Sequence, residues 1–219
     1  MEKKILSERQ KKILGTIGAQ RDIASLFYLS GGTALAGYYL FHRYSEDLDF
    51  FSEKEFDVRG ITVFLSQLKN TLKFSSIDFQ QSLNRNLFFL RFPDEVLKME
   101  FTYYPFPRIE RGQIRNGLVI DSLLDIAVNK LFTIYQRSTA RDYIDLYCIC
   151  KKERWEIADL MAKAKIKFDW HIDPLQLGTQ FLKSEAAQDV PRMIDTITPN
   201  VWKTFFREEA KRLKSAIIT

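Results

Sequence analysis

The first half of the chain combines two patterns of apolar positions. Apolar residues recur every three or four positions over residues 5–25 and 58–68, which predicts amphipathic helices in both segments. Short runs rich in β-branched and aromatic residues lie between polar breaks and predict strands. These runs cover residues 27–29, 48–51, 72–80, 86–92, 96–104 and 117–120. Between the first two runs, the sequence predicts a helix over residues 33–41 with Thr33 as its cap.

The second half of the chain has helical periodicity almost throughout. The helical segments are residues 122–168, 173–187 and 199–216. The pattern therefore predicts the α+β fold class, with an α+β part over residues 1–120 and an all-helical part over residues 121–219.

The composition is that of an ordinary globular protein. Apolar residues make up 46% and charged residues 28% of the 219 residues, and a net charge of +5 does not by itself indicate a nucleic-acid partner. No apolar run approaches the roughly 20 residues of a membrane-spanning helix, and polar Ser7-Glu8-Arg9-Gln10 interrupts any signal-peptide core. Cys148 and Cys150 lie two apart in a helical segment, so their side chains diverge and we expect two reduced thiols. We expect no membrane association and a cytoplasmic location.

The sequence Gly31-Gly32-Thr33 lies between a predicted strand and a predicted helix. Glycine has no Cβ, so a phosphate can approach this backbone closely. The free N–H groups and the positive dipole end of a helix N-terminus favour an anion, and Thr33 adds a hydroxyl donor. This order predicts a phosphate-binding loop, although a glycine pair taken alone is more often a simple turn.

Three acidic residues are candidates for a metal site. Asp47 and Asp49 lie two residues apart at the next predicted strand, so we expect both carboxylates on one face. Two adjacent carboxylates repel each other unless a cation lies between them, and carboxylate oxygens suit Mg²⁺, with a two-ion site as one arrangement. Glu100 lies in a mostly apolar strand, where an unpaired charge is costly, and is the candidate third ligand. Taken alone, the Asp47–Asp49 pair also fits a solvated surface.

Two blocks of the sequence carry a family resemblance. The first is Leu29-Ser30-Gly31-Gly32-Thr33-Ala34-Leu35-Ala36 with Arg43-Tyr44-Ser45-Glu46-Asp47-Leu48-Asp49-Phe50. The second is Lys130-Leu131-Phe132, then Arg137, then Arg141-Asp142-Tyr143-Ile144-Asp145-Leu146-Tyr147. Together they resemble the AbiEii/AbiGii abortive-infection toxins, a family of the DNA polymerase β-like nucleotidyltransferase superfamily. The resemblance implies a mixed sheet with flanking helices and a helical domain that closes over the nucleotide.

The resemblance also implies roles for individual residues. Asp47 and Asp49 match the metal-binding pair, Gly31, Gly32 and Thr33 match the phosphate loop, and Lys130 and Asp142 match the essential positions of the second block. Glu100 matches less closely, because the family commonly carries Asp there.

The residues themselves leave the second block open to two interpretations. Lys130 is a long cation that could reach a triphosphate, with a solvated lysine as the less favoured alternative. Arg141 and Asp145 lie four apart on one predicted helix face, which allows a structural ion pair. Arg43 and Ser45 precede the acids and would either hold that loop or contact the γ-phosphate.

The sequence with its resemblance predicts a Mg²⁺-dependent nucleotidyltransferase that moves an NMP from an NTP to an acceptor. The acceptor would be a tRNA end or a protein hydroxyl, and the protein would be the toxin of a toxin–antitoxin or phage-defence pair whose antitoxin is encoded nearby. The candidate catalytic residues are Asp47, Asp49, Glu100, Lys130 and Asp142, and the candidate NTP-binding residues are Gly31, Gly32, Thr33, Arg43, Ser45 and Lys130. Two alternatives stay open: a small-molecule nucleotidyltransferase of the antibiotic-modifying kind, and a binding module that keeps the fold without the chemistry.

Overall fold

The computed structural model describes residues 5–218, and the chain divides into two compact units. Unit 1 comprises the described residues up to Tyr39, together with Ser45–Pro107 and Arg111–Ser122. Unit 2 comprises Leu40–Tyr44, Arg108–Glu110 and the described residues from Leu123 onward. The chain therefore enters unit 2 twice, for a few residues each time, before its third and final passage.

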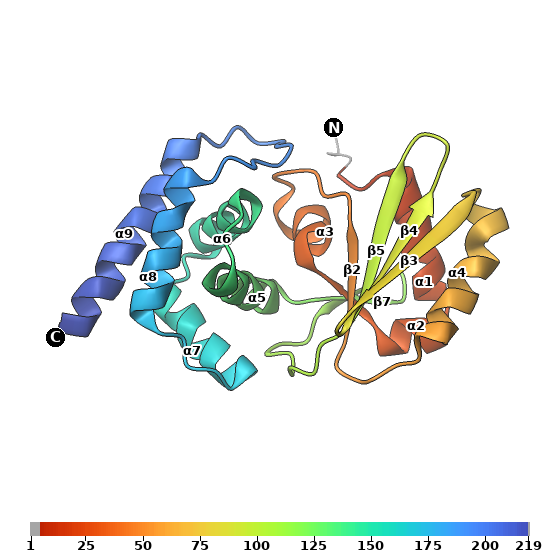
Figure 1. Ribbon diagram of the computed structural model, residues 1–219, viewed down its shortest axis with the longest axis horizontal. Helices are drawn as coiled ribbons and strands as arrows, with labels where there is room; N and C mark the ends of the chain where they lie inside the picture. The colour runs from red at the N-terminus through yellow and green to blue at the C-terminus, as the bar shows by residue number, and fades with distance from the viewer. Residues whose placement is uncertain (1–4, 219) are drawn as a thin grey trace. The chain divides into compact units, whose positions relative to one another are not determined.

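Unit 1 is built on a seven-stranded mixed sheet in the order β3-β4-β5-β2-β1-β7-β6 (Figure 1). The strands are β1 (Tyr28–Ser30), β2 (Leu48–Ser52), β3 (Ser76–Ser82), β4 (Arg85–Arg91), β5 (Val96–Tyr103), β6 (Gln113–Arg115) and β7 (Leu118–Ile120). The central strand β2 runs antiparallel to β1 and parallel to β5, and β1 runs parallel to β7. The outer pairs β3–β4, β4–β5 and β6–β7 are antiparallel.

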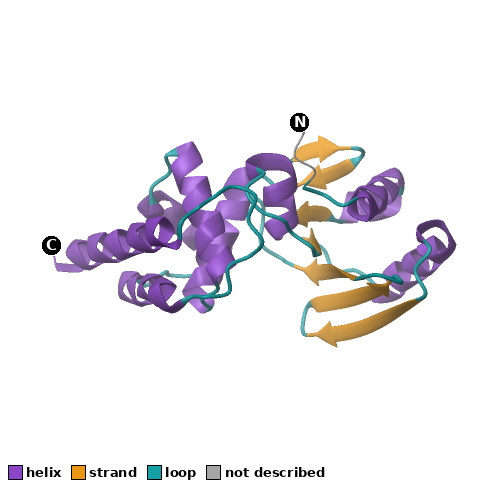
Figure 2. Cartoon of the chain, turned by 90° about the horizontal axis from the view of Figure 1, so that it is seen from above, coloured by secondary structure: helices purple, strands orange, loops and turns teal. Residues whose placement is uncertain are grey.

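The two faces of this sheet differ in chemistry because successive side chains of a strand point to opposite faces. On one face Phe50 and Phe101 stack with ring centroids 4.9 Å apart, and both are fully buried. The helices α1 (Glu8–Ala19), α2 (Arg21–Leu26) and α4 (Val58–Leu72) lie on this apolar side (Figure 2). The other face carries Asp49 and Glu100, and α3 (Gly31–Leu35) packs there against β1 and β2, followed by the π-helix η1 (Ala36–Leu40).

The described C-terminal part of unit 2 consists of helices joined by loops. Its elements are α5 (Leu123–Gln136), α6 (Ala140–Glu153), α7 (Ile157–Phe168), α8 (Pro174–Leu182), the 3₁₀-helix η2 (Lys183–Ala186) and α9 (Pro199–Ile218). The core between α6, α8 and α9 is aromatic: Tyr143 stacks on Trp202, and Phe206 contacts both Tyr143 and Phe181. Aromatic side chains bury large apolar areas, so this cluster fixes how the three helices pack.

A buried ion pair attaches the short segment Arg108–Glu110 to the helices of unit 2. The carboxylate of Asp125 accepts hydrogen bonds from the backbone N–H groups of Ile109 and Glu110 at 2.8 and 3.0 Å. The ammonium of Lys167 lies 2.6 Å from the same carboxylate, and neither side chain has exposed surface. A buried charge is tolerated only when it is paired and hydrogen-bonded, and Asp125 meets both conditions.

The predicted fold class is confirmed, and several boundaries are corrected. The helix expected from Thr33 begins at Gly31, and the hydroxyl of Thr33 bonds to the backbone oxygen of Asp47 instead of capping the helix. The strand expected from Leu72 begins at Ser76, because the apolar spacing of α4 continues to Leu72 and the chain turns at Lys73 in the left-handed region. The strand β6 was not predicted, since its three residues are all exposed and show no alternation.

Two further expectations concern the cysteines and the membrane. Cys148 and Cys150 are both free thiols on α6, as predicted, and burial raises the pKa of each to about 12. None of the helices within residues 5–218 combines the length and the apolar character that crossing a bilayer requires.

Candidate functional site

The predicted phosphate loop brings α3 against the carboxylate of Asp49. Gly31 has a φ of +69°, a conformation that favours glycine, and both glycines of the pair are partly exposed. A Cβ placed on Gly31 would lie only 2.5 Å from Oδ2 of Asp49. The glycine is therefore required twice, once for the backbone conformation and once for the close approach of this carboxylate.

Substitution of Gly31 by alanine should destabilise the protein, whereas alanine ordinarily stabilises a helix relative to glycine. We expect Gly31→Ala to lower the free energy of unfolding by about 1–2 kcal/mol for the left-handed backbone alone, with a further loss from the contact with Asp49. Gly15→Ala is the matched control, because Gly15 lies inside α1 with no atom within 4 Å of the added Cβ, and it should gain up to about 1 kcal/mol. Urea unfolding measures both, and a Gly31→Ala protein as stable as the wild type would contradict the geometry.

The three candidate metal ligands lie in unit 1, on or next to neighbouring strands. Asp49 of β2 is directly opposite Glu100 of the parallel strand β5. Asp47 lies one residue before β2 begins, where the buried hydroxyl of Thr33 bonds to its backbone oxygen. Ser45 is in the same loop, and its carbonyl oxygen accepts a hydrogen bond from the amide of Gln10 at 2.9 Å.

Two cations that the sequence analysis did not identify lie among these acids. Lys98 of β5 places its Nζ 3.0 Å from Oδ2 of Asp47 and 3.8 Å from Oε2 of Glu100. Arg85 of β4 binds Glu100 in a bidentate pair, with Nε to Oε1 at 2.6 Å and Nη2 to Oε2 at 2.7 Å. Burial alone would raise the pKa of Glu100, but the hydrogen bonds from Arg85 and Thr102 outweigh it and hold this pKa below its ordinary value.

These acids supply the right type of donor for a hard cation, but they are not assembled into a triad. Carboxylate oxygens are the ligands that Mg²⁺ prefers, so Asp47 and Asp49 fit such an ion chemically. Within residues 5–218, no group of three or more His, Cys, Asp or Glu side chains is arranged to hold a metal. The carboxylate of Glu100 is directed at Arg85 and at the hydroxyl of Thr102, 2.8 Å away. Glu100 would fit as a third ligand only after it leaves Arg85.

A second set of site residues forms a buried charge network in unit 2, which we call the Asp145 network. Its members are Asp145, Asp142, Lys130, Arg43 and His42. Arg43 binds both carboxylate oxygens of Asp145, with Nε to Oδ1 at 2.7 Å and Nη2 to Oδ2 at 2.8 Å. Nε2 of His42 lies 2.8 Å from Oδ1 of Asp145. The side chain of Asp145 has no exposed surface, so these partners replace the water it has lost.

Lys130 lies between the two carboxylates of this network. Its Nζ is 2.7 Å from an oxygen of Asp142 and 2.7 Å from an oxygen of Asp145. Burial would lower the pKa of Lys130, but the charges of Asp145 and Asp142 overcome it and raise this pKa above its ordinary value. For Asp145, burial acts in the opposite direction, and Lys130 and Arg43 hold its pKa well below the ordinary value. Lys130 is thus a charged member of a closed network and not a solvated lysine.

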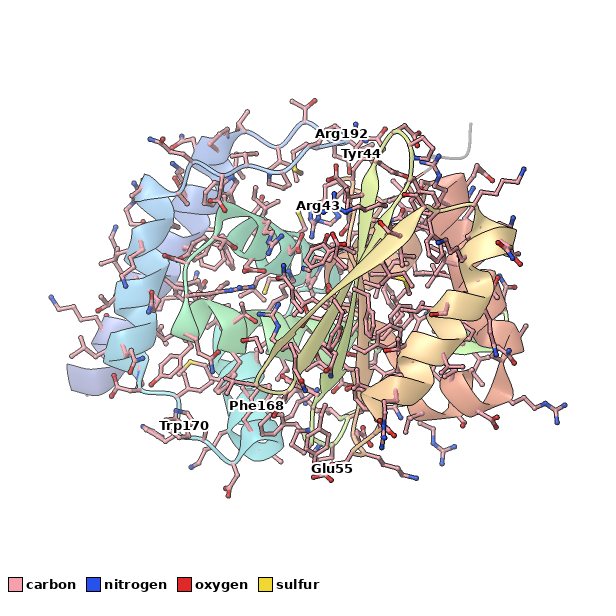
Figure 3. The ribbon with its side chains drawn as sticks, turned by 45° about the vertical axis from the view of Figure 1, so that its right-hand side comes forward. Arg43, Tyr44, Glu55, Phe168, Trp170 and Arg192 are labelled. Atoms are coloured by element: carbon pink, nitrogen blue, oxygen red, sulfur yellow. The ribbon has the colours of Figure 1, made fainter. Side chains whose placement is uncertain are left out.

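Arg43 is held from its backbone side as well. The segment 42–44 pairs antiparallel with residues 192–195: the N–H of Tyr44 donates to Arg192 O at 2.9 Å, and the N–H of Ile194 donates to His42 O at 2.8 Å. The guanidinium of Arg192 lies 3.8 Å from the ring centroid of Tyr44, and Figure 3 shows these two residues next to Arg43. Of the two roles that the sequence left open for Arg43, the contacts correspond to holding the loop.

The sequence analysis assigned no site role to Asp145, Lys98 or Arg85. Helix spacing had allowed an Arg141–Asp145 pair, but Arg141 is exposed while Asp145 points to Arg43, which is 102 residues away in sequence. A signal for Asp145 was present, because it is flanked by Ile144 and Leu146 in an apolar stretch, where an acid must be paired. For Lys98, the signal was its position two residues before Glu100, on the same face of the strand.

Comparison with known proteins places the chain in a family and gives similar folds. The sequence profile of the nucleotidyl transferase AbiEii toxin family, of type IV toxin–antitoxin systems, matches residues 13–214. An uncharacterised protein of Aquifex aeolicus is 32% identical over 167 residues, which are 74% of this chain and 76% of that protein. The fold is similar to JHP933 of Helicobacter pylori, with a TM-score of 0.58 and 22% identity over 96% of this chain and 94% of that one. A second H. pylori structure, of a candidate nucleotidyltransferase, gives a TM-score of 0.58 and 21% identity over 96% and 97% of the two chains. Because the family profile extends over nearly the whole sequence, the chain belongs to the AbiEii nucleotidyl transferase toxin family.

Proposed function

We propose that this protein transfers a nucleoside monophosphate from an NTP to an acceptor in a reaction that depends on a divalent cation, most simply Mg²⁺. The observation that carries the proposal is the close approach of Gly31 to Asp49, with Glu100 directly opposite on the neighbouring strand. A glycine loop at the start of a helix and a pair of carboxylates are the two parts that phosphoryl chemistry needs: one admits a phosphate, the other holds its counter-ion.

Within this proposal the residues of unit 1 have distinct tasks. Asp47 and Asp49 would hold the cation, which when bound polarises a phosphate oxygen and stabilises the charge that develops on it. Thr33 fixes the loop that carries Asp47 through its hydrogen bond to the backbone oxygen, and Gly31 with Gly32 leaves space for phosphate. Ser45 remains a candidate NTP contact in the same loop.

We propose that the charged residues of unit 2 position the site and do not contact the substrate. Lys130 and Arg43 were expected to contact the triphosphate, but their charged groups are buried and bound to Asp142 and Asp145. We propose that they fix segment 42–44, which continues directly into the loop of Asp47. The closure of the helical part over the nucleotide remains a proposal that rests on the family resemblance.

The family supports an antitoxin as partner, and the chemistry of the transfer guides the proposal for the acceptor. A type IV toxin has a cognate antitoxin, which we expect to be encoded nearby. For the acceptor we retain a tRNA end or a protein hydroxyl, because a hydroxyl oxygen can attack the α-phosphate and displace pyrophosphate. A small antibiotic-like acceptor and a binding module without turnover are the alternatives.

A transfer assay tests the proposal and separates its alternatives. The protein is incubated with each of the four α-labelled NTPs, Mg²⁺ and a total cell extract, and pyrophosphate release is measured alongside the labelled products. Label sensitive to ribonuclease identifies RNA as acceptor, label sensitive to protease identifies protein, and label in the small-molecule fraction indicates the antibiotic-type activity. Labelling must stop when EDTA is added. Absence of both pyrophosphate and labelled product with every NTP would leave the binding module.

A further inference from the structure

The acids of unit 1 are paired with cations of the chain itself. Lys98 bridges Asp47 and Glu100, which come from different segments, with its Nζ 3.0 and 3.8 Å from their oxygens. Arg85 binds both carboxylate oxygens of Glu100 through two hydrogen bonds. The side chain of Glu100 is 7% exposed, while those of Lys98 and Arg85 are 24% and 49% exposed. Both cations are therefore more exposed than Glu100, whereas Asp47, at 35%, is more exposed than Lys98.

A divalent ion bound by Asp47 and Glu100 would compete with these cations for carboxylate oxygens. Oδ2 of Asp47 is bound to Lys98, and both oxygens of Glu100 are bound to Arg85. A carboxylate oxygen that accepts a charged hydrogen bond can coordinate a metal only by weakening that bond, because the two positive charges repel each other at contact distance. The same cations relieve the repulsion among the acids when no ion is bound.

We propose that Lys98 and Arg85 are internal counter-cations that compete with the divalent ion for Asp47 and Glu100, so that metal binding requires Lys98 to release Asp47. The inference rests on the proposed function, since it takes these acids as the metal ligands. It also assigns a substrate contact to Lys98, because an ammonium released beside the metal is placed to pair with a phosphate of the nucleotide. Metal and nucleotide would then bind cooperatively, each favouring the state in which Lys98 has left Asp47.

Binding of Mn²⁺ without nucleotide tests the competition without relying on activity. Free Mn²⁺ is measured by electron paramagnetic resonance while the full-length protein is titrated. We expect Lys98→Met to bind Mn²⁺ about tenfold more tightly than the wild type, because the competing charge is gone. Lys98→Arg keeps the charge and should bind like the wild type. Lys69→Met removes an exposed charge from the end of α4 and should also leave the affinity unchanged.

The outcomes separate this inference from the proposed function. Equal or weaker Mn²⁺ binding by Lys98→Met, while Asp47→Asn abolishes binding, would overturn the competition and leave the metal site in place. No Mn²⁺ binding by either the wild type or Lys98→Met would overturn both proposals. Circular dichroism checks that each variant is folded, and Lys98→Gln, which keeps most of the side-chain length, replaces Lys98→Met if the latter does not fold.

Discussion

Replacing Lys130 by methionine is expected to lower the free energy of unfolding by about 3–5 kcal/mol, the usual cost of removing one partner from a buried ion pair. The side chains of Asp142 and Asp145 are 3% and 0% exposed, so water cannot take the place of the lost ammonium. For a chain of this size the thermal midpoint should fall by roughly 6–20 °C. Calorimetry or urea unfolding measures the change, and nucleotidyl transfer should fall with it.

Substitution of an exposed lysine serves as a control, because it removes a positive charge without breaking a buried ion pair. Lys211→Met removes an exposed ammonium that pairs with Glu208 on α9, and it should leave the thermal midpoint unchanged. Adding Asp142→Asn to Lys130→Met should recover part of the lost stability, because it removes one of the stranded negative charges. Wild-type stability of Lys130→Met would show that the network is not closed in solution.

The pH dependence gives a second check on the same variant. The depressed pKa values of Asp142 and Asp145 contribute stability that is present above the ordinary carboxyl pKa of about 4 and is lost as pH falls through the lower folded-state values. Without Lys130 these carboxyls should take up protons at higher pH than in the wild type. The difference in unfolding free energy between wild type and Lys130→Met should therefore shrink as the solution is acidified below pH 4, whereas a purely steric defect would keep it constant.

Asp49→Asn is expected to reduce nucleotidyl transfer by about a thousandfold or more while leaving the fold intact. A metal ligand contributes several kcal/mol to stabilising the transition state, and each 1.36 kcal/mol corresponds to a factor of ten in rate. The thermal midpoint should stay close to that of the wild type, because Asp49 is partly exposed and the amide has nearly the same shape as the carboxylate. Asp47→Asn should lose activity in the same way, although it also gives up the ion pair with Lys98.

The control for this prediction is an acid on the same sheet that has no proposed role. Asp78 of β3 pairs with Arg91, and both side chains are about half exposed, so Asp78→Asn should retain transfer. Labelled NTP and pyrophosphate release provide the readout for all three variants. Transfer by Asp49→Asn at the wild-type rate would remove this residue from the metal site.

The sequence predicted the parts of the site that depend on local order along the chain. Gly31 to Asp49 lie within one strand–helix–strand unit, whose apolar periodicity and glycine pair are visible in a short window of residues. The sequence identified Glu100 as a candidate third ligand, from an acid in an apolar strand and a looser family match. Its position opposite Asp49 could not be predicted, because the sequence of one strand does not determine its register with another.

What could not be predicted depends on residues that are far apart in sequence. Helix spacing places Asp142 and Asp145 on one face of α6, but it does not predict that Lys130 of α5 contacts both. Nor does it predict that Arg43 reaches Asp145 across 102 residues and pairs with a segment near residue 193. Arg85 meets Glu100 only because β4 and β5 form a hairpin in one particular register. Such contacts arise from tertiary packing. The local sequence pattern predicts whether a charged residue lies in a helix or a strand, but only the packing of distant segments determines which residue it pairs with.

Two short segments from the first half of the chain, Leu40–Tyr44 and Arg108–Glu110, belong to unit 2. This limits how the protein can be cut into fragments and the order in which unit 2 can form during synthesis. A fragment that begins near residue 121 would contain α5 to α9 but would lack His42 and Arg43, which bind Asp145. During synthesis Arg43 is present first and Asp145 is missing, because Arg43 leaves the ribosome about a hundred residues before Asp145 does. The charge network can close only once most of the polypeptide exists, so the helical half is not an independent module that could be exchanged between proteins by joining coding sequences at a single point.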